Sequence, residues 1–142
     1  MKALSMKQPV PELILSRLKT LEIRTWNTNF RGEFYLHASQ NLIPRLMSKF
    51  ELKKEDLPSG CLVGKAELVD VIKFENKDHF ASMEHKHLVN AIDWFQEGRT
   101  YGFVLENPTR LEKPIKFPGK LNFFNVDQLK PQKILLDKND EN

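Results

Sequence analysis

The stretch Lys19-Thr20-Leu21-Glu22-Ile23-Arg24 carries three charged side chains between two hydrophobic segments. Polar and apolar side chains alternate through this stretch, which predicts a half-buried strand with Leu21 and Ile23 on one face. Glu22 and Arg24 then share the opposite face about 6.7 Å apart, because a strand advances about 3.3–3.4 Å per residue. A free surface has no need of such a pattern between two hydrophobic elements. A cleft that holds a polar ligand does.

These charged groups have the chemistry to recognise a nucleotide. A carboxylate beside two cations stays ionised, because the cations lower its pKa. Lys19 and Arg24 can donate to phosphate or carbonyl oxygens, and the guanidinium of Arg24 offers a planar fork. Trp26 falls on the same strand face and offers a surface on which a base could stack. The alternative is a solvated strand face, where ion pairs contribute little to stability.

The surrounding sequence predicts an α+β chain. The expected strands cover residues 2–6, 20–26, 33–39, 60–74, 101–106, 111–117 and 121–126. A helix is expected to open at Gln8-Pro9-Val10-Pro11 and to bury Leu13, Ile14 and Leu18, with further helices at 41–50 and 78–97. The prolines within 111–117 favour an edge position. The irregular spacing of the strands favours a small mixed β-barrel with helices at its openings over a doubly wound sheet.

The length of 142 residues fits one domain, which we place at 1–130, followed by a polar C-terminal tail at 131–142. No stretch approaches the ~20 apolar residues of a membrane span, and the first residues lack the pattern of a signal peptide. The single cysteine, Cys61, excludes an internal disulfide and a cysteine-rich zinc site. A cytoplasmic location without membrane association is therefore expected.

Positive charge is concentrated in the part of the chain that contains the charged stretch. Residues 1–50 contain eight Lys or Arg and three Asp or Glu, whereas residues 51–100 contain seven and ten. A local basic patch favours a phosphate-bearing partner, although this excess is also common on ordinary protein surfaces.

The charged stretch and its flanks resemble a known family. Lys19, Glu22 and Arg24 match the charged positions of the ASCH domain signature Gly-x-Lys-x-x-Glu-x-Arg, whose glycine position is occupied by Arg17 here. The flanking motifs that add to the resemblance are Leu4-Ser5-Met6-Lys7-Gln8-Pro9, Arg31-Gly32, His37-Ala38-Ser39, residues 101–106 and Phe123-Phe124-Asn125-Val126. The resemblance covers roughly residues 1–127.

This resemblance implies a PUA-like fold, a small β-barrel with helices that frame a cleft. It also implies that Lys19, Glu22 and Arg24 line the cleft and that the ligand is RNA or a nucleotide. Ser5 and Gln8 precede the first helix and could line the same cleft, although helix capping is an equal alternative. Trp26 and His37 complete the set of candidate binding residues. No cofactor is expected, and the sequence names no protein partner.

A second possibility is an enzyme that acts on a modified nucleoside or on RNA. The family includes proteins that hydrolyse N4-acylated cytidines and proteins reported to cut RNA. In the amidohydrolase pattern a threonine nucleophile stands where this chain has Glu22, and Thr20 falls two residues earlier. Lys19 and Glu22 would then be the catalytic residues, as a pair that polarises water. Glu84 or Glu97 could add a carboxylate.

Other reactive side chains do not form a recognisable site in the sequence. His85 and His87 point about 200° apart on a helix, so they and His79 do not predict a metal site. Cys61 lies in an apolar strand, where a lone cysteine usually serves packing. Trp94 and Phe95 have the spacing of helical core residues. We therefore expect no metal centre.

Overall fold

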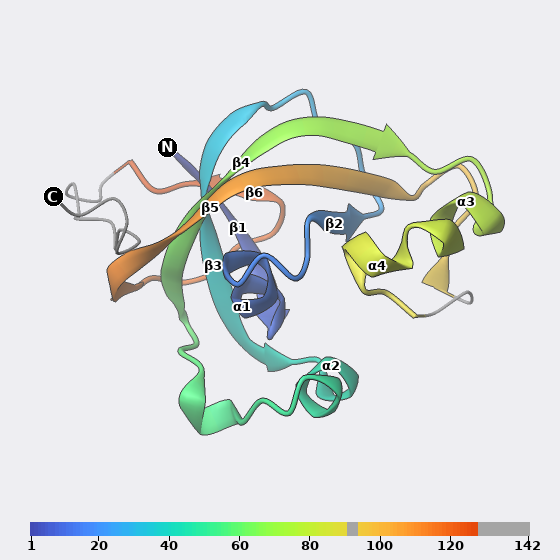
Figure 1. Cartoon of the computed structure of the whole chain (residues 1–142). Coiled ribbons are helices and arrows are strands. Elements are labelled where there is room, and N and C mark those ends of the chain that lie inside the picture. Colours follow the sequence, from blue (N-terminus) through green and yellow to red (C-terminus); the bar gives the residue numbers. More distant parts are fainter. Residues whose placement is uncertain (91–93, 128–142) are drawn as a thin grey trace, which may run out of the picture.

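A computed structural model describes residues 1–90 and 94–127 (Figure 1). Six strands form one sheet in the order β2-β5-β4-β3-β1-β6. The strands are β1 (Lys2–Gln8), β2 (Leu21–Arg24), β3 (Gly32–Leu42), β4 (Cys61–Lys73), β5 (Tyr101–Lys116) and β6 (Phe123–Asn125). The helical elements are α1 (Val10–Leu15), α2 (Pro44–Lys49), η1 (Lys54–Asp56), α3 (Lys77–Ser82) and α4 (Glu84–His87). None of these helices is long and apolar enough to cross a membrane.

The sheet is mixed, because β1 and β3 run parallel whereas the other neighbours are antiparallel. Strands β2 and β6 form its two ends, and no pairing joins them within the described residues. The α+β class is therefore established, whereas the expected closure into a barrel is not confirmed. Figure 1 shows β4 and β5 as long strands that sweep across the molecule together, with α1 packed against the concave side of the sheet.

The main core lies between the sheet and α1. Leu4, Leu36 and Phe34 from β1 and β3 are fully buried and belong to one cluster with Leu13 and Ile14 of α1. Because α1 ends at Leu15, Leu18 falls outside it and remains half exposed, at 52%. The prediction that Leu18 shares the buried helix face is therefore wrong.

Gly64 allows the sheet to pack closely against α1. A Cβ atom at this position would lie 2.5 Å from the carbonyl oxygen of Thr109 and 2.6 Å from Leu15 Cδ2. The pairing of β4 with β5 shifts register between Leu62 and Gly64, as it does at a β-bulge. The absence of a side chain thus lets β5, β4 and α1 meet.

The predicted helix at 78–97 is wrong. The segment instead forms α3 and α4, and the chain leaves α4 at Leu88 with a φ of +62°.

The predicted strands 101–106 and 111–117 form a single strand, β5. β2 pairs only with residues 101–104 of β5, so among the described elements the proline-containing half has β4 as its sole neighbour. Helix α2 begins at Pro44, not at residue 41, because β3 continues to Leu42.

The predicted tail at 131–142 lies outside the described residues.

Candidate functional site

Lys19, Glu22 and Arg24 form a compact buried cluster. Lys19 lies in the connection between α1 and β2, and Glu22 and Arg24 project from the same face of β2. The Glu22 carboxylate lies between the two cations. Its Oε1 is 3.4 Å from Lys19 Nζ, and its Oε2 accepts from Nε and Nη2 of Arg24 at 3.1 and 2.9 Å. Only 3% of Lys19 and 7% of Glu22 are exposed, so this is not a solvated strand face.

The cations of this region also hold the chain at the end of α4. Lys19 Nζ donates to the carbonyl oxygen of His87, and Arg45 Nη2 donates to that of Leu88 at 2.8 Å. The backbone N–H of Thr20 donates to the carbonyl oxygen of Lys86 at 3.0 Å. Three successive carbonyls therefore have donors from outside the helix. These contacts satisfy the free carbonyls at a helix end, which explains why α4 stops where a longer helix was predicted.

Burial and mutual attraction set the charge state of the cluster. Burial lowers the pKa of Lys19, although the Glu22 carboxylate opposes this effect. For Glu22, burial alone raises the pKa, but the attraction of Arg24 and Lys19 outweighs it, and the pKa falls below its usual value. Glu22 is therefore an ionised group that pairs with a cation on each side. Arg24 also donates from Nη2 to the carbonyl oxygen of Ser5 at 3.0 Å.

The cluster lines a cavity of about 550 Å³, which we call the Lys19 cavity. Its lining residues include four lysines and arginines and one glutamate, namely Lys7, Lys19, Arg24, Arg45 and Glu22. Its apolar walls come from Met6, Val10, Ile23, Ile43, Leu46 and Val89, and Trp26 and Trp94 also line it. A positive end next to apolar walls suits a ligand that joins an anionic group to a flat ring.

The two tryptophans differ in how firmly they are packed. Trp26 contacts Phe103 and Phe123 at nearly right angles, with centroid distances of 5.2 and 5.9 Å, so it belongs to an aromatic cluster as well as to the cavity wall. Trp94 is 36% exposed and lies parallel to Phe80, with their centroids 6.3 Å apart. The prediction that Trp94 is a core residue is therefore wrong, whereas Phe95 is buried as expected.

Two of the predicted binding residues lie elsewhere. Gln8 is buried and donates from Nε2 to the carbonyl oxygen of Pro58 at 2.9 Å, so it connects the end of β1 to a distant loop. His37 lines a separate cavity of about 340 Å³. Neither is among the described residues that line the Lys19 cavity. Ser5 does line it, but its hydroxyl bonds to His37, and its contact with the charged cluster is through its carbonyl oxygen.

The hydrogen bonds of His37 fix its tautomer. Its Nε2–H donates to the carbonyl oxygen of Phe117 at 2.6 Å, so Nδ1 accepts from the Ser5 hydroxyl at 2.9 Å. Burial lowers the pKa of His37, which keeps the ring neutral. His37 therefore has a structural role between β3 and the segment after β5.

Sequence reasoning missed Arg45 and Lys7. Arg45 follows the proline that begins α2 and bonds across 43 residues of sequence to Leu88. No local pattern links these two positions, so only the tertiary structure brings Arg45 to the cavity. Lys7 belongs to the motif that resembles the ASCH family, which was the available signal for it.

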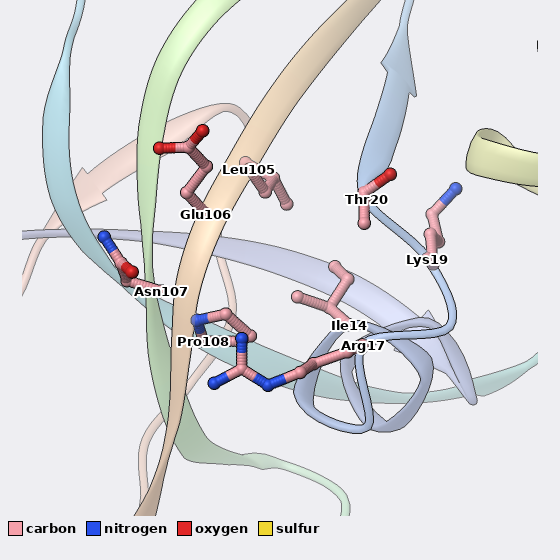
Figure 2. A pocket seen from close by; sticks show the side chains of 8 residues that line it. All are labelled: Ile14, Arg17, Lys19, Thr20, Leu105, Glu106, Asn107 and Pro108. Carbon is pink, nitrogen blue, oxygen red and sulfur yellow. The ribbon is translucent and has the colours of Figure 1, made fainter.

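A second cavity, of about 450 Å³, lies between the α1–β2 connection and β5 (Figure 2). We call it the Arg17 cavity, and its lining residues are Ile14, Arg17, Lys19, Thr20, Leu105, Glu106, Asn107 and Pro108. Thr20, which falls two residues before the position of the threonine nucleophile in the amidohydrolase pattern, lines this cavity and is not among the described residues that line the Lys19 cavity. Glu84 and Glu97 are absent from the described linings of both.

Arg17 explains the departure from the family signature. Its φ is +68°, in the left-handed region where glycine is free of steric strain. The chain therefore keeps the backbone conformation that a glycine would adopt, while its side chain differs.

No group of three or more His, Cys, Asp or Glu in the described parts of the chain is arranged to hold a metal ion. Burial raises the pKa of the Cys61 thiol, which disfavours its nucleophilic form.

Comparisons with known proteins agree with this architecture. Activating signal cointegrator 1 of Mus musculus and of Homo sapiens are each 27% identical to the chain over 132 residues, covering 84% of it. The chain spans only 21% of the length of these relatives. The crystal structure of ASCH from Zymomonas mobilis matches with a TM-score of 0.64 at 14% identity, covering 89% of this chain and 87% of that one. A mutant of the same protein matches with a TM-score of 0.63 at 14% identity, covering 89% and 90%.

At 14% identity the structural matches establish the fold alone. The ASCH domain model matches residues 4–117, which include the whole charged stretch and both cavities up to Pro108. The chain therefore belongs to the ASCH domain family.

Proposed function

We propose that this ASCH domain binds RNA or a nucleotide in the Lys19 cavity. The observation that carries the proposal is the convergence of Lys7, Lys19, Arg24 and Arg45 on a cavity whose other walls are apolar. Phosphate binds preferentially to such cations, and a base can occupy the apolar part of the cavity. A PUA-like relationship and a cytoplasmic location belong to the same proposal.

The residues that line the Lys19 cavity have different roles in ligand binding. Lys19 and Glu22 are engaged with each other and with the protein, so they shape the positive end of the cavity and keep Arg24 in place. Arg24 and Arg45 each use Nη2 for a backbone carbonyl, and both line the cavity. Their remaining N–H groups are the donors we assign to phosphate or base oxygens. Trp26 and Trp94 provide the aromatic surface.

The proposal is tested by fluorescence anisotropy with short single-stranded RNAs over a range of salt concentrations. We expect salt-dependent binding by the wild type. Arg45→Gln should bind more weakly, with a log–log salt slope less steep by about 0.7, since one phosphate contact on a single strand is lost. Lys54→Gln removes an exposed cation from η1, which does not line the cavity, and is the matched control.

Two results would contradict the proposal. If the wild type binds neither RNA nor any ribonucleotide, the function is wrong. If it binds RNA but Arg45→Gln and Lys54→Gln behave alike, the site is wrong. Thermal unfolding of each variant separates loss of binding from loss of the fold.

A second candidate function is hydrolysis of an acylated nucleoside. One observation favours it: burial lowers the pKa of Lys19, which makes its amine a better base than a solvated lysine. Against it, Glu22 is already paired with both cations and Thr20 lines the other cavity. Chromatographic detection of cytidine released from N4-acylcytidines tests this function. Release that persists in Lys19→Met would exclude Lys19 as the base.

A further inference from the structure

The two cavities share the Lys19 side chain. Its stem lines the Arg17 cavity, and its ammonium group reaches Glu22 and the carbonyl oxygen of His87 at the Lys19 cavity. Figure 2 shows the Lys19 amine directed away from Arg17, toward the neighbouring helical segment. The two cavities are therefore neighbours that share this one buried lining residue.

Arg17 has a free guanidinium. Its side chain is exposed and extends toward Pro108 in Figure 2. Within residues 1–90 and 94–127 we find no hydrogen bond or ion pair from this guanidinium, although Glu106 lines the same cavity. By contrast, Lys19, Arg24 and Arg45 each donate to a backbone carbonyl. All five N–H donors of Arg17 are thus available to a ligand.

The backbone conformation of Arg17 bears on the role of its side chain. A φ of +68° is a conformation in which glycine fits better than any residue with a Cβ. A large, exposed side chain at such a position adds little packing to offset the strain. Backbone strain of this kind supports a functional hypothesis when the side chain it carries lines a cavity.

The other groups of the cavity define the ligand. Ile14, Leu105 and Pro108 provide an apolar surface for a base or a ribose. The Asn107 amide is engaged, because its Nδ2 donates to Glu67 Oε2 at 3.0 Å. Glu106 disfavours a second phosphate beside it but can accept from a hydroxyl or an amine. The cavity therefore suits a group that carries one anionic end and several donors, as a nucleotide within a strand does.

We infer that the Arg17 cavity is a second nucleotide subsite, so that the ligand is a single-stranded RNA segment of at least two nucleotides. This inference rests on the proposed function. One nucleotide occupies the Lys19 cavity, the strand passes over the Lys19–Thr20 connection, and Arg17 donates to the phosphate of the adjoining nucleotide. Glu106 accepts from a hydroxyl or amine of that nucleotide.

Isothermal titration with ribonucleoside 5′-monophosphates and with 5′-phosphorylated diribonucleotides tests the inference. We expect the wild type to bind the best dinucleotide about tenfold more tightly than the best mononucleotide, since a charge-assisted contact is added. Arg17→Gly should remove most of that gain and leave mononucleotide affinity within about twofold. Glycine suits the backbone at this position, so the variant should fold. Lys113→Gln, at an exposed position of β5 outside both cavities, is the control.

The outcomes separate the two proposals. Equal affinities of the wild type for mononucleotide and dinucleotide, or an unchanged ratio in Arg17→Gly, would overturn the second subsite while nucleotide binding in the Lys19 cavity stands. No binding of either probe by the wild type would overturn the proposed function, and the inference with it.

Discussion

The Lys19 cavity and the Arg17 cavity use positive charge in different ways. In the first, Lys19 and Arg24 are paired with Glu22, and Arg45 holds the end of α4. In the second, Arg17 is exposed and has no partner among the described residues. Cations of the first kind contribute to the fold as well as to any ligand contact, whereas Arg17 can contribute to a ligand alone. Substitutions of these cations should therefore destabilise the fold in the first cavity but not in the second.

The strongest test of this comparison is Lys19→Ala. The substitution removes the donor to the His87 carbonyl and leaves the buried Glu22 carboxylate with Arg24 alone. We expect the free energy of unfolding to fall by about 3–5 kcal/mol, as when one partner of a buried ion pair is removed. Urea unfolding measures this change, with Lys54→Ala as the control. A loss below about 1 kcal/mol would mean that the cluster is as weakly coupled to the fold as a surface pair.

Lowering the pH should destabilise the structure around the Lys19 cavity more than the structure around the Arg17 cavity, because His87 lines only the Lys19 cavity. His87 Nδ1 accepts from the backbone N–H of Val89, and its Nε2–H donates to the Phe80 carbonyl, so the ring is held neutral. Burial lowers the pKa of His87 below 6.5, as it does for His37. The unfolded chain therefore binds more protons below about pH 6.5, and stability falls as the pH is lowered.

The slope reaches at most about 1.4 kcal/mol per pH unit for each histidine. Glu22 adds a further loss below its unfolded pKa of 4.5, because its folded pKa is lower still. Urea unfolding at pH 7.5 and 5.5 measures the slope, and His87→Gln and His37→Gln should each flatten it. A wild-type stability that is constant over this interval would contradict the buried neutral state of both rings.

Arg45→Met gives a smaller effect in the same cavity. Because Arg45 is exposed and only its Nη2 bonds to Leu88, we expect a loss of about 1 kcal/mol. Hydrogen exchange at residues 86–90 should rise in the variant if this contact holds the end of α4. Unchanged exchange there would show that the contacts of Lys19 and Thr20 are sufficient to hold the end of α4.

Arg17→Gly has the smallest expected effect on stability and the opposite sign. Relief of the positive φ should stabilise the fold by about 1 kcal/mol, and the greater flexibility of glycine in the unfolded chain should offset about half of this. Thermal unfolding should therefore show a small rise in Tm. A fall in Tm would mean that the Arg17 side chain contributes to packing, and the contrast between the two cavities would be lost.

The local patterns of the sequence predicted much of the sheet. Alternation identified β2 with Glu22 and Arg24 on one face, and the ASCH signature identified Lys19 as their neighbour. The helix at 78–97 failed because its termination depends on Lys19, Thr20 and Arg45, which bind carbonyls far away in sequence. Helix propensity describes a segment in isolation, so it cannot include hydrogen-bond donors that tertiary packing brings from elsewhere in the chain.

The candidate site was likewise predictable from the sequence only in part. The residue types and spacing at 19–24 were sufficient to predict a charged cluster, because alternation along a strand and charge attraction act over a few residues. Only the tertiary structure decided that Gln8 and His37 lie outside the cavity, that Arg45 lines it, and that Lys19 separates it from a second cavity. These placements depend on which strands and helices become neighbours, and that is settled by the packing of the whole core.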